Sequence, residues 1–138
     1  MGKIKAIITQ NVDGLPQKAG SNNVIELHGN VSKNYCINCD EEYNLDYIVN
    51  SKNITTCKYC GSIIKPDIVL YQEPLKNEIM VRAIDFISAA DLLVVGETFL
   101  IFYPETGLIE HFRGDNLVLI NKDKTNYDNN TDIVIISP

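Results

Sequence analysis

The sequence predicts an α/β protein with a parallel sheet and an inserted four-cysteine module. Short apolar runs alternate with helical patterns along most of the chain, an order typical of parallel strands joined by helices. Two Cys-x-x-Cys pairs interrupt that alternation. The chain has 138 residues, of which 45% are hydrophobic and 22% charged, so it is long enough and apolar enough to bury a core.

Composition also argues against several classes of function. The chain has 12 Lys and Arg residues against 18 Asp and Glu residues, and the net charge of −6 argues against a general nucleic-acid binder. No apolar run approaches the roughly 20 residues that a membrane-spanning helix requires. The N-terminus lacks the apolar stretch of a secretory signal, so we expect a cytoplasmic protein with no membrane partner.

Each strand is predicted from a short apolar run. Ile4–Thr9 is rich in Ile and nearly continuous, as in a strand buried on both faces of a sheet. Comparable runs predict five further strands, at Val24–Leu27, Ile68–Tyr71, Leu92–Val95, Leu117–Ile120 and Ile133–Ile136.

Two segments change to a helical period. Leu75–Ala90 places its apolar side chains on one stripe and its charged side chains on the opposite face. A second helix is expected from Pro104 to Gly114, because Pro is favoured in the first turn. His111 falls in the middle of that helix on a solvated face, and we assign it no function. Asn121–Thr131 is expected to be a polar loop.

The spacing of the cysteines is the most specific feature of the sequence. Cys36-x-x-Cys39 is followed by 17 residues and then by Cys57-x-x-Cys60, which fits a zinc-binding pattern. Each two-residue spacer lets one tight turn aim two thiolates at one point, and two such turns complete a tetrahedron. Four sulfur ligands leave no position for water, so this zinc would be structural. The alternatives are a redox or disulfide pair and unrelated free thiols.

The segment between the two cysteine pairs is too polar and too short to form a core of its own. Its acidic run, Asp40–Glu42, is expected to be solvated surface. Metal ligation would supply the missing folding energy. We therefore expect residues 32–63 to form a zinc-binding module, inserted between residues 1–31 and 64–138 of the α/β domain.

Polar side chains follow several of the predicted strands. Ligands of such folds bind at the carboxyl ends of the strands, and carboxamide, carboxylate and imidazole groups suit a polar ligand. The alternative is local: Asn11 and Asp13 would shape a turn, and His28 would be an exposed loop histidine. The residues concerned are Gln10, Asn11, Asp13, His28, Asn121 and Lys122.

Taken together, these motifs resemble the sirtuins, a family of NAD-dependent protein-lysine deacylases. The resemblance spans nearly the whole chain and depends on several motifs in one order. They are Thr9–Leu15, Glu26–Gly29, the paired cysteines, Pro66, Val69, Tyr71–Glu73, Val94–Gly96, Tyr103–Pro104 and Leu119–Lys122.

The resemblance implies a partial Rossmann-like doubly wound parallel sheet with a zinc module inserted between its strands. It also implies NAD and structural zinc as cofactors, with the zinc held by Cys36, Cys39, Cys57 and Cys60. An acyl-lysine protein is the implied substrate.

The resemblance also implies roles for single residues. His28 matches the catalytic base, which takes a proton from a ribose hydroxyl after the acyl oxygen has displaced nicotinamide; imidazole suits this role because it titrates near neutral pH. Val69 matches the segment that pairs with the substrate backbone. The positions implied to bind NAD are Gln10, Asn11, Asp13, Thr98, Asn121 and Lys122.

The sequence also departs from the family pattern. The Gly-rich phosphate-binding loop with which the family begins is absent from these 138 residues, and Glu97-Thr98-Phe99 replaces a Gly-Thr-Ser loop. Pro16 replaces a histidine, and Tyr71-Gln72-Glu73 replaces Phe-Gly-Glu, which loses a permissive glycine. Because backbone N–H groups of the Gly-rich loop hold the pyrophosphate, we expect an N-terminally truncated form that binds NAD weakly or not at all alone.

Two classes of function follow. The first is a sirtuin-type deacylase that is complete only with an N-terminal half, and we expect exposed apolar surface that such a half or a second copy would cover. The second is a non-catalytic, zinc-stapled protein-interaction module or a degenerate gene product.

Overall fold

The structure is a computed structural model that describes residues 3–96, 106–125 and 127–137. The chain divides into two compact units, Met1–Met80 and Val81–Pro138, each of which is described by itself. Thr98 and Pro104, the predicted start of the second helix, lie outside the described residues. Within the described residues, no helix has the length and apolar character needed to cross a membrane.

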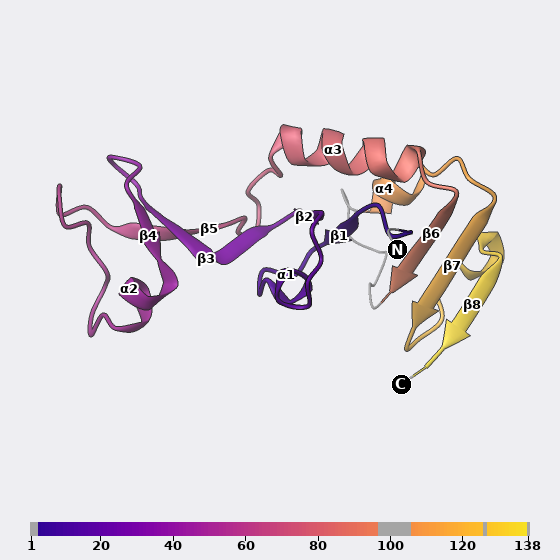
Figure 1. The fold of residues 1–138 in the computed structure, drawn as a ribbon, viewed down its shortest axis with the longest axis horizontal. Coiled ribbons are helices and arrows are strands. Elements are labelled where there is room, and N and C mark those ends of the chain that lie inside the picture. The colour runs from indigo at the N-terminus through magenta and orange to yellow at the C-terminus, as the bar shows by residue number, and fades with distance from the viewer. Residues whose placement is uncertain (1–2, 97–105, 126, 138) are drawn as a thin grey trace. The chain divides into compact units, whose positions relative to one another are not determined.

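The first unit opens with two short parallel strands, β1 (Ile7–Thr9) and β2 (Val24–Glu26), joined through the helix α1 (Leu15–Lys18) (Figure 1). Ile7 pairs with Val24 and Thr9 with Glu26. The expectation that the first strand begins at Ile4 is wrong, because the pairing begins opposite Val24 and Ile4 is exposed. The predicted parallel pairing is confirmed.

A twisted antiparallel sheet follows in the order β4-β3-β5, formed by β3 (Gly29–Cys36), β4 (Glu42–Asn44) and β5 (Ile64–Ile68). The helix α2 (Leu45–Val49) follows β4. The prediction of a strand over Ile68–Tyr71 is wrong. Its pairing partner β3 begins at Gly29, opposite Ile68, so the ladder ends there and the chain turns, with the Glu73 N–H donating to the Leu70 carbonyl.

The module around the cysteines has a small core, contrary to the expectation from its polar sequence. Cys36, Cys57 and Ile64 are buried, and three partly buried side chains pack against them: Tyr43, Tyr47 and Ile48. The rings of Tyr43 and Tyr47 stack with their centroids 4.7 Å apart. Two of the three buried residues are cysteines, so the core depends on the groups that would hold the metal.

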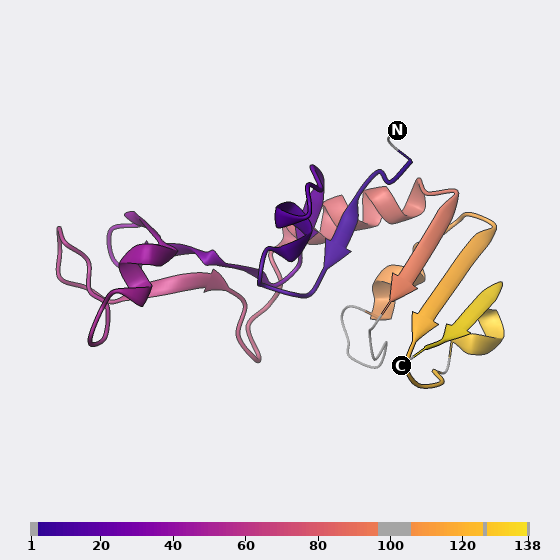
Figure 2. The ribbon, with the colours of Figure 1, turned by 60° about the horizontal axis from the view of Figure 1, so that its bottom comes forward.

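The second unit is a parallel sheet in the order β6-β7-β8, as Figure 2 shows. Its strands are β6 (Leu92–Gly96), β7 (Asn116–Asn121) and β8 (Ile133–Ile136), and the 3-10 helix η1 (Asp128–Asn130) lies in the predicted polar loop. The alternation of strands and helices predicted from the sequence is therefore confirmed in this unit.

Both predicted helices are shorter than expected. α3 (Asn77–Ser88) buries Ala83 and Ile87, which belong to the apolar stripe. α4 (Thr106–Ile109) ends before the predicted Gly114, and its last residues are followed by turns in which the His111 N–H donates to the Leu108 carbonyl. The placement of His111 in the middle of a helix is therefore wrong.

Gly29 is required where β2 turns into β3. Its φ is +80°, and a Cβ built there would lie 1.9 Å from the Asp67 carbonyl oxygen. A side chain would therefore push β3 away from β5 next to His28.

We expect Gly29→Ala to destabilise the zinc-loaded chain by about 3 kcal/mol, the sum of left-handed backbone strain and a backbone clash. Gly20→Ala is the matched control, because Gly20 also has a positive φ of +90° but no atom within 4 Å of the added Cβ. It should cost only about 1 kcal/mol. Urea denaturation measures both, and equal losses would contradict the role of the close approach.

Candidate functional site

Each cysteine pair forms a tight turn of the same construction. In the first, the Asn38 N–H points at the Cys36 sulfur, 3.5 Å away, and the Asp40 N–H donates to the Cys36 carbonyl. In the second, the Tyr59 N–H points at the Cys57 sulfur, 3.4 Å away, and the Gly61 N–H donates to the Cys57 carbonyl. Both turns therefore present their two sulfurs to one side.

The residue after each pair adopts a left-handed backbone. Gly61 has a φ of +74°, which costs glycine nothing, whereas Asp40 has a φ of +56°. Asp is one of the few residues that tolerates this conformation. The acidic run that begins at Asp40 is exposed, as expected.

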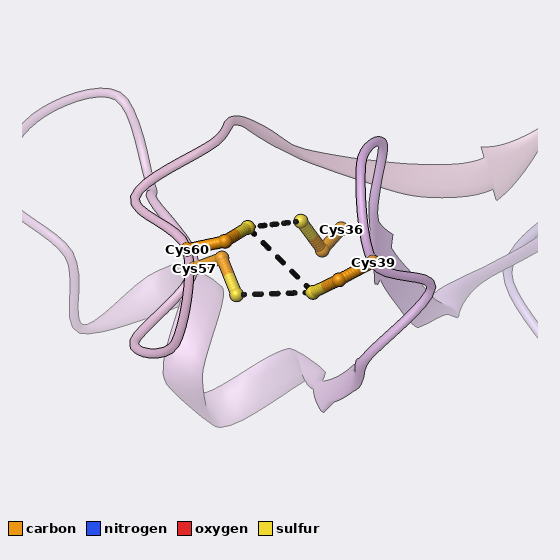
Figure 3. A group of neighbouring side chains, drawn as sticks. All are labelled: Cys36, Cys39, Cys57 and Cys60. Carbon is orange, nitrogen blue, oxygen red and sulfur yellow. Dashed lines mark hydrogen bonds between the residues drawn. The ribbon is translucent and has the colours of Figure 1, made fainter.

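The four sulfurs meet at one point (Figure 3). The sulfur of Cys36 lies 3.4 Å from that of Cys60, and the sulfur of Cys39 lies 3.6 Å from those of Cys57 and Cys60. A tetrahedral ion with zinc–sulfur distances of about 2.3 Å requires sulfurs about 3.8 Å apart. All four cysteines are free thiols rather than disulfides, and the donor set fits a structural zinc ion.

The surroundings of the sulfurs affect their ionisation differently. Hydrogen bonding from Ser62, first from its backbone, lowers the pKa of Cys60 to about 6. The backbone of Glu41 acts to lower the pKa of Cys39, but hydrogen bonding to Cys36, burial and the other sulfurs raise it to about 12.

Sequence reasoning missed Tyr43, whose hydroxyl donates to the Cys57 sulfur at 3.2 Å and accepts the Lys58 N–H. This contact orients a ligand, as groups around metal sites commonly do.

His28 lies in the turn between β2 and β3, at the carboxyl end of the two parallel strands. Its Nδ1 is 3.0 Å from the Gln10 carbonyl oxygen, and its own carbonyl accepts the Val69 N–H. A carbonyl can only accept, so Nδ1 is the donor in this contact and carries a proton. The structure thus brings together Gln10, His28 and Val69, three of the predicted site residues.

Asn11 and Asp13 occupy the loop after β1. The Asn11 N–H donates to the Thr9 hydroxyl, and an Asp13 carboxylate oxygen accepts the Leu15 N–H at 2.9 Å. Asp13 therefore shapes the turn before α1, which is the local role that the sequence left open. Asn121 and Lys122 lie at the carboxyl end of β7 in the second unit, where Asn121 is buried and Lys122 exposed.

Glu73 holds the turn that follows Val69. Its carboxylate accepts the Leu70 N–H at 2.9 Å and forms an ion pair of 3.0 Å with Lys65. The Leu70 N–H, and next the Lys65 ammonium, lower the pKa of Glu73 below its ordinary value. Gln72 has a φ of +69° in this turn, at the position where it replaces the glycine of the family pattern.

Residues 1–104, which make up three quarters of the chain, match the Sir2 family. The chain therefore belongs to this family. The doubly wound class expected from the resemblance agrees with solved Sir2 structures. One, from work on sirtuin substrate affinity, superposes with a TM-score of 0.89 at 37% identity, covering 96% of this chain and 56% of that one. A Sir2 structure with a p53 peptide and NAD+ gives a TM-score of 0.85 at 37% identity, covering 96% and 57%.

Curated relatives carry the name NAD-dependent protein deacetylase. The protein of Clostridium perfringens is 55% identical over 136 residues, which cover 98% of this chain and 56% of the relative. That of Clostridium acetobutylicum is 52% identical over 135 residues, covering 97% and 55%. The chain therefore spans about half the length of the curated relatives that it matches.

We expect one zinc ion per chain, and its removal by a chelator should abolish the fold of the β4-β3-β5 sheet. Zinc binding of such sites is worth about 10 kcal/mol or more, well above the stability of so small a core. Metal analysis and hydrogen exchange of residues 29–68 measure both effects. Cys57→Ser should behave like the chelated chain, and Lys52→Ser, an exposed substitution in the same module, should behave like the wild type. A metal-free chain with four titratable thiols and an intact sheet would contradict this expectation.

We expect the contribution of Glu73 to stability to depend on pH. Because folding lowers its pKa from the ordinary value of 4.5, the stabilisation is complete above that value and is lost as the pH falls through the lower pKa of the folded chain. Urea denaturation of the wild type and Glu73→Gln should therefore differ most near neutral pH and converge in acid. Glu78→Gln on α3 is the control, and an equal pH dependence in both variants would refute the assignment.

Proposed function

We propose that this chain is the part of a Sir2-type NAD-dependent protein deacetylase that carries the general base, the adjoining cofactor loop and the zinc module. The observation that carries the proposal is the placement of His28, whose ring nitrogen faces the Gln10 carbonyl and whose backbone is held by Val69. The names of the relatives support the reaction class. The predicted boundaries, with residues 32–63 as the zinc module, belong to this proposal, as does a cytoplasmic location.

His28 acts as the base in this proposal. NAD supplies the ribose that accepts the acyl group from an acyl-lysine side chain. With its proton on Nδ1, the imidazole accepts a ribose hydroxyl proton at Nε2, and the Gln10 carbonyl stabilises the imidazolium that forms. Burial of Leu27 beside it, only 3% exposed, keeps the turn that bears His28 in place.

The remaining predicted residues line the cofactor and the substrate. Gln10, Asn11 and Asp13 are proposed at the nicotinamide and ribose end, and Thr98, Asn121 and Lys122 at other parts of NAD. Val69 is proposed to pair with the backbone of the acyl-lysine substrate, beyond the point where the β3–β5 ladder ends.

We further propose that this chain alone is weak or inactive and is completed by the remainder of a Sir2-type chain. One face of the β6-β7-β8 sheet supports this, because both faces of a parallel sheet are normally covered. Register places Leu92, Val94, Ile133 and Ile135 on the same face, and they are 54%, 54%, 54% and 43% exposed. The unmatched part of the relatives, nearly half their length, is the occupant that we propose for this face.

The test is complementation. The chain is mixed with the part of the Clostridium perfringens relative that it does not match, and nicotinamide release from NAD with an acetyl-lysine peptide is measured. We expect no turnover from the chain alone, turnover from the mixture, and a loss of about 100-fold or more in His28→Ala.

His111→Ala is the matched control, and we expect it to keep the activity of the wild-type mixture. Robust turnover by the chain alone would contradict the need for a partner. An assembled but inactive mixture would contradict the enzyme assignment and favour the zinc-stapled interaction module. Self-association of the chain in place of binding to the added half would show that a second copy covers the exposed face.

A further inference from the structure

The carboxylate of Glu26 links the segment after β1 to the segment after β2, which carries His28. Glu26 ends β2, directly opposite Thr9 at the end of β1, so the loops that follow the two strands begin at the same level of the sheet. One carboxylate oxygen, Oε1, accepts from Gln17 Nε2 at 2.7 Å and from Asn30 Nδ2. Gln17 lies on α1, beyond the loop that carries Gln10, and Asn30 is two residues after His28.

Asn30 is buried, with 7% of its surface exposed, and both ends of its amide are engaged. Its Nδ2 donates to Glu26, and its Oδ1 accepts the Ser32 N–H at 2.8 Å. A Cβ added to Gly14 would lie 3.2 Å from the same Nδ2, so the loop after β1 packs directly against this side chain. Asn30 is therefore fixed between the loop of Gln10 and the start of β3.

Backbone hydrogen bonds already tie the two loops at two levels. The Leu27 N–H donates to the Thr9 carbonyl, and the Val31 N–H donates to the Val12 carbonyl. The contact between His28 Nδ1 and the Gln10 carbonyl lies between these ties. Glu26 adds side-chain hydrogen bonds at both loops, and bonds to an ionised acceptor are stronger than those between neutral groups.

We propose that Glu26 is a positioning residue for His28: by holding Gln17 and Asn30 on one oxygen, it sets the separation between the two loops and thereby keeps the His28 proton on Nδ1. This inference deepens the proposed function, because it concerns the placement of the proposed base. The hydrogen bonds of Glu26 described above go to Gln17 and Asn30, so its proposed effect on the ring runs through these two residues.

The test is the proton position on the imidazole of His28, read from the nitrogen NMR shifts of the zinc-loaded chain at alkaline pH, where the ring is neutral. The wild type should carry the proton on Nδ1 in most molecules. Glu26→Ala should reduce that fraction to below half, while Glu26→Gln, which keeps an acceptor oxygen in the same place, should restore it. His111, the second of the two histidines, serves as an internal reference that no variant should change.

Gln17→Ala keeps the proposal testable if Glu26→Ala does not fold, because Gln17 is exposed and the change removes only one of the two hydrogen bonds. It should shift the proton distribution in the same direction, by a smaller amount. An unchanged distribution in folded Glu26→Ala, or in Gln17→Ala if the former is unfolded, would overturn the proposal, as would a failure of Glu26→Gln to restore it. The measurement needs neither NAD nor turnover, so a failed complementation leaves it intact and disproves only the role of His28 as base.

Discussion

The antiparallel pairing of β3 with β5 is the constraint on which the rest of the first unit depends. At one end of this ribbon, Cys36 and Ile64 form the last pair, beside the sulfur cluster. At the other end, Gly29 pairs with Ile68, and the N–H of Val69, directly after β5, holds the His28 carbonyl. The four-sulfur site and the proposed base are therefore two ends of one piece of sheet. A chain that lost its metal would lose the ladder that holds His28, even though no ligand touches that residue.

The parallel strands of the second unit were predicted well because a nearly continuous apolar run leaves a simple signal. Ile133–Ile136 was predicted with its observed bounds, and Leu117–Ile120 lies within β7. The apolar run at Ile68–Tyr71 was misleading, because the ladder extends only as far as Gly29, and the strand is instead built from the more polar Ile64–Ile68. Sheet limits depend on the partner strand, which a single run of residues does not reveal.

The candidate site shows the same division between local and long-range information. The cysteine spacing predicted the sulfur cluster, because a tight turn and its two ligands are encoded within four residues. The contact of Tyr43 with Cys57, and that of Glu26 with Gln17, depend on how separate segments pack. The sequence motif included Glu26 beside His28 but carried no sign that its carboxylate spans two loops. The contacts of Glu26 depend on the pairing of β1 with β2, which sets Glu26 opposite Thr9 at the start of the loop that leads to Gln17.

The separation of the two ends of the ribbon has a consequence for how a metal ion would influence the base. Gly29 and Cys36 pair with Ile68 and Ile64, which lie four steps apart on β5, roughly 13 Å at about 3.3 Å per residue. Charges in salt solution are screened over about 8 Å, so the ionic charge of the sulfur cluster contributes little to the electrostatic potential at the imidazole. The coupling between the two ends is therefore elastic rather than electrostatic. Exchange of one tetrahedral divalent ion for another would leave the proton chemistry at His28 unaltered, whereas one residue inserted into β5 between Ile64 and Ile68 would shift its register against β3 and turn the side chains beyond the insertion to the opposite face.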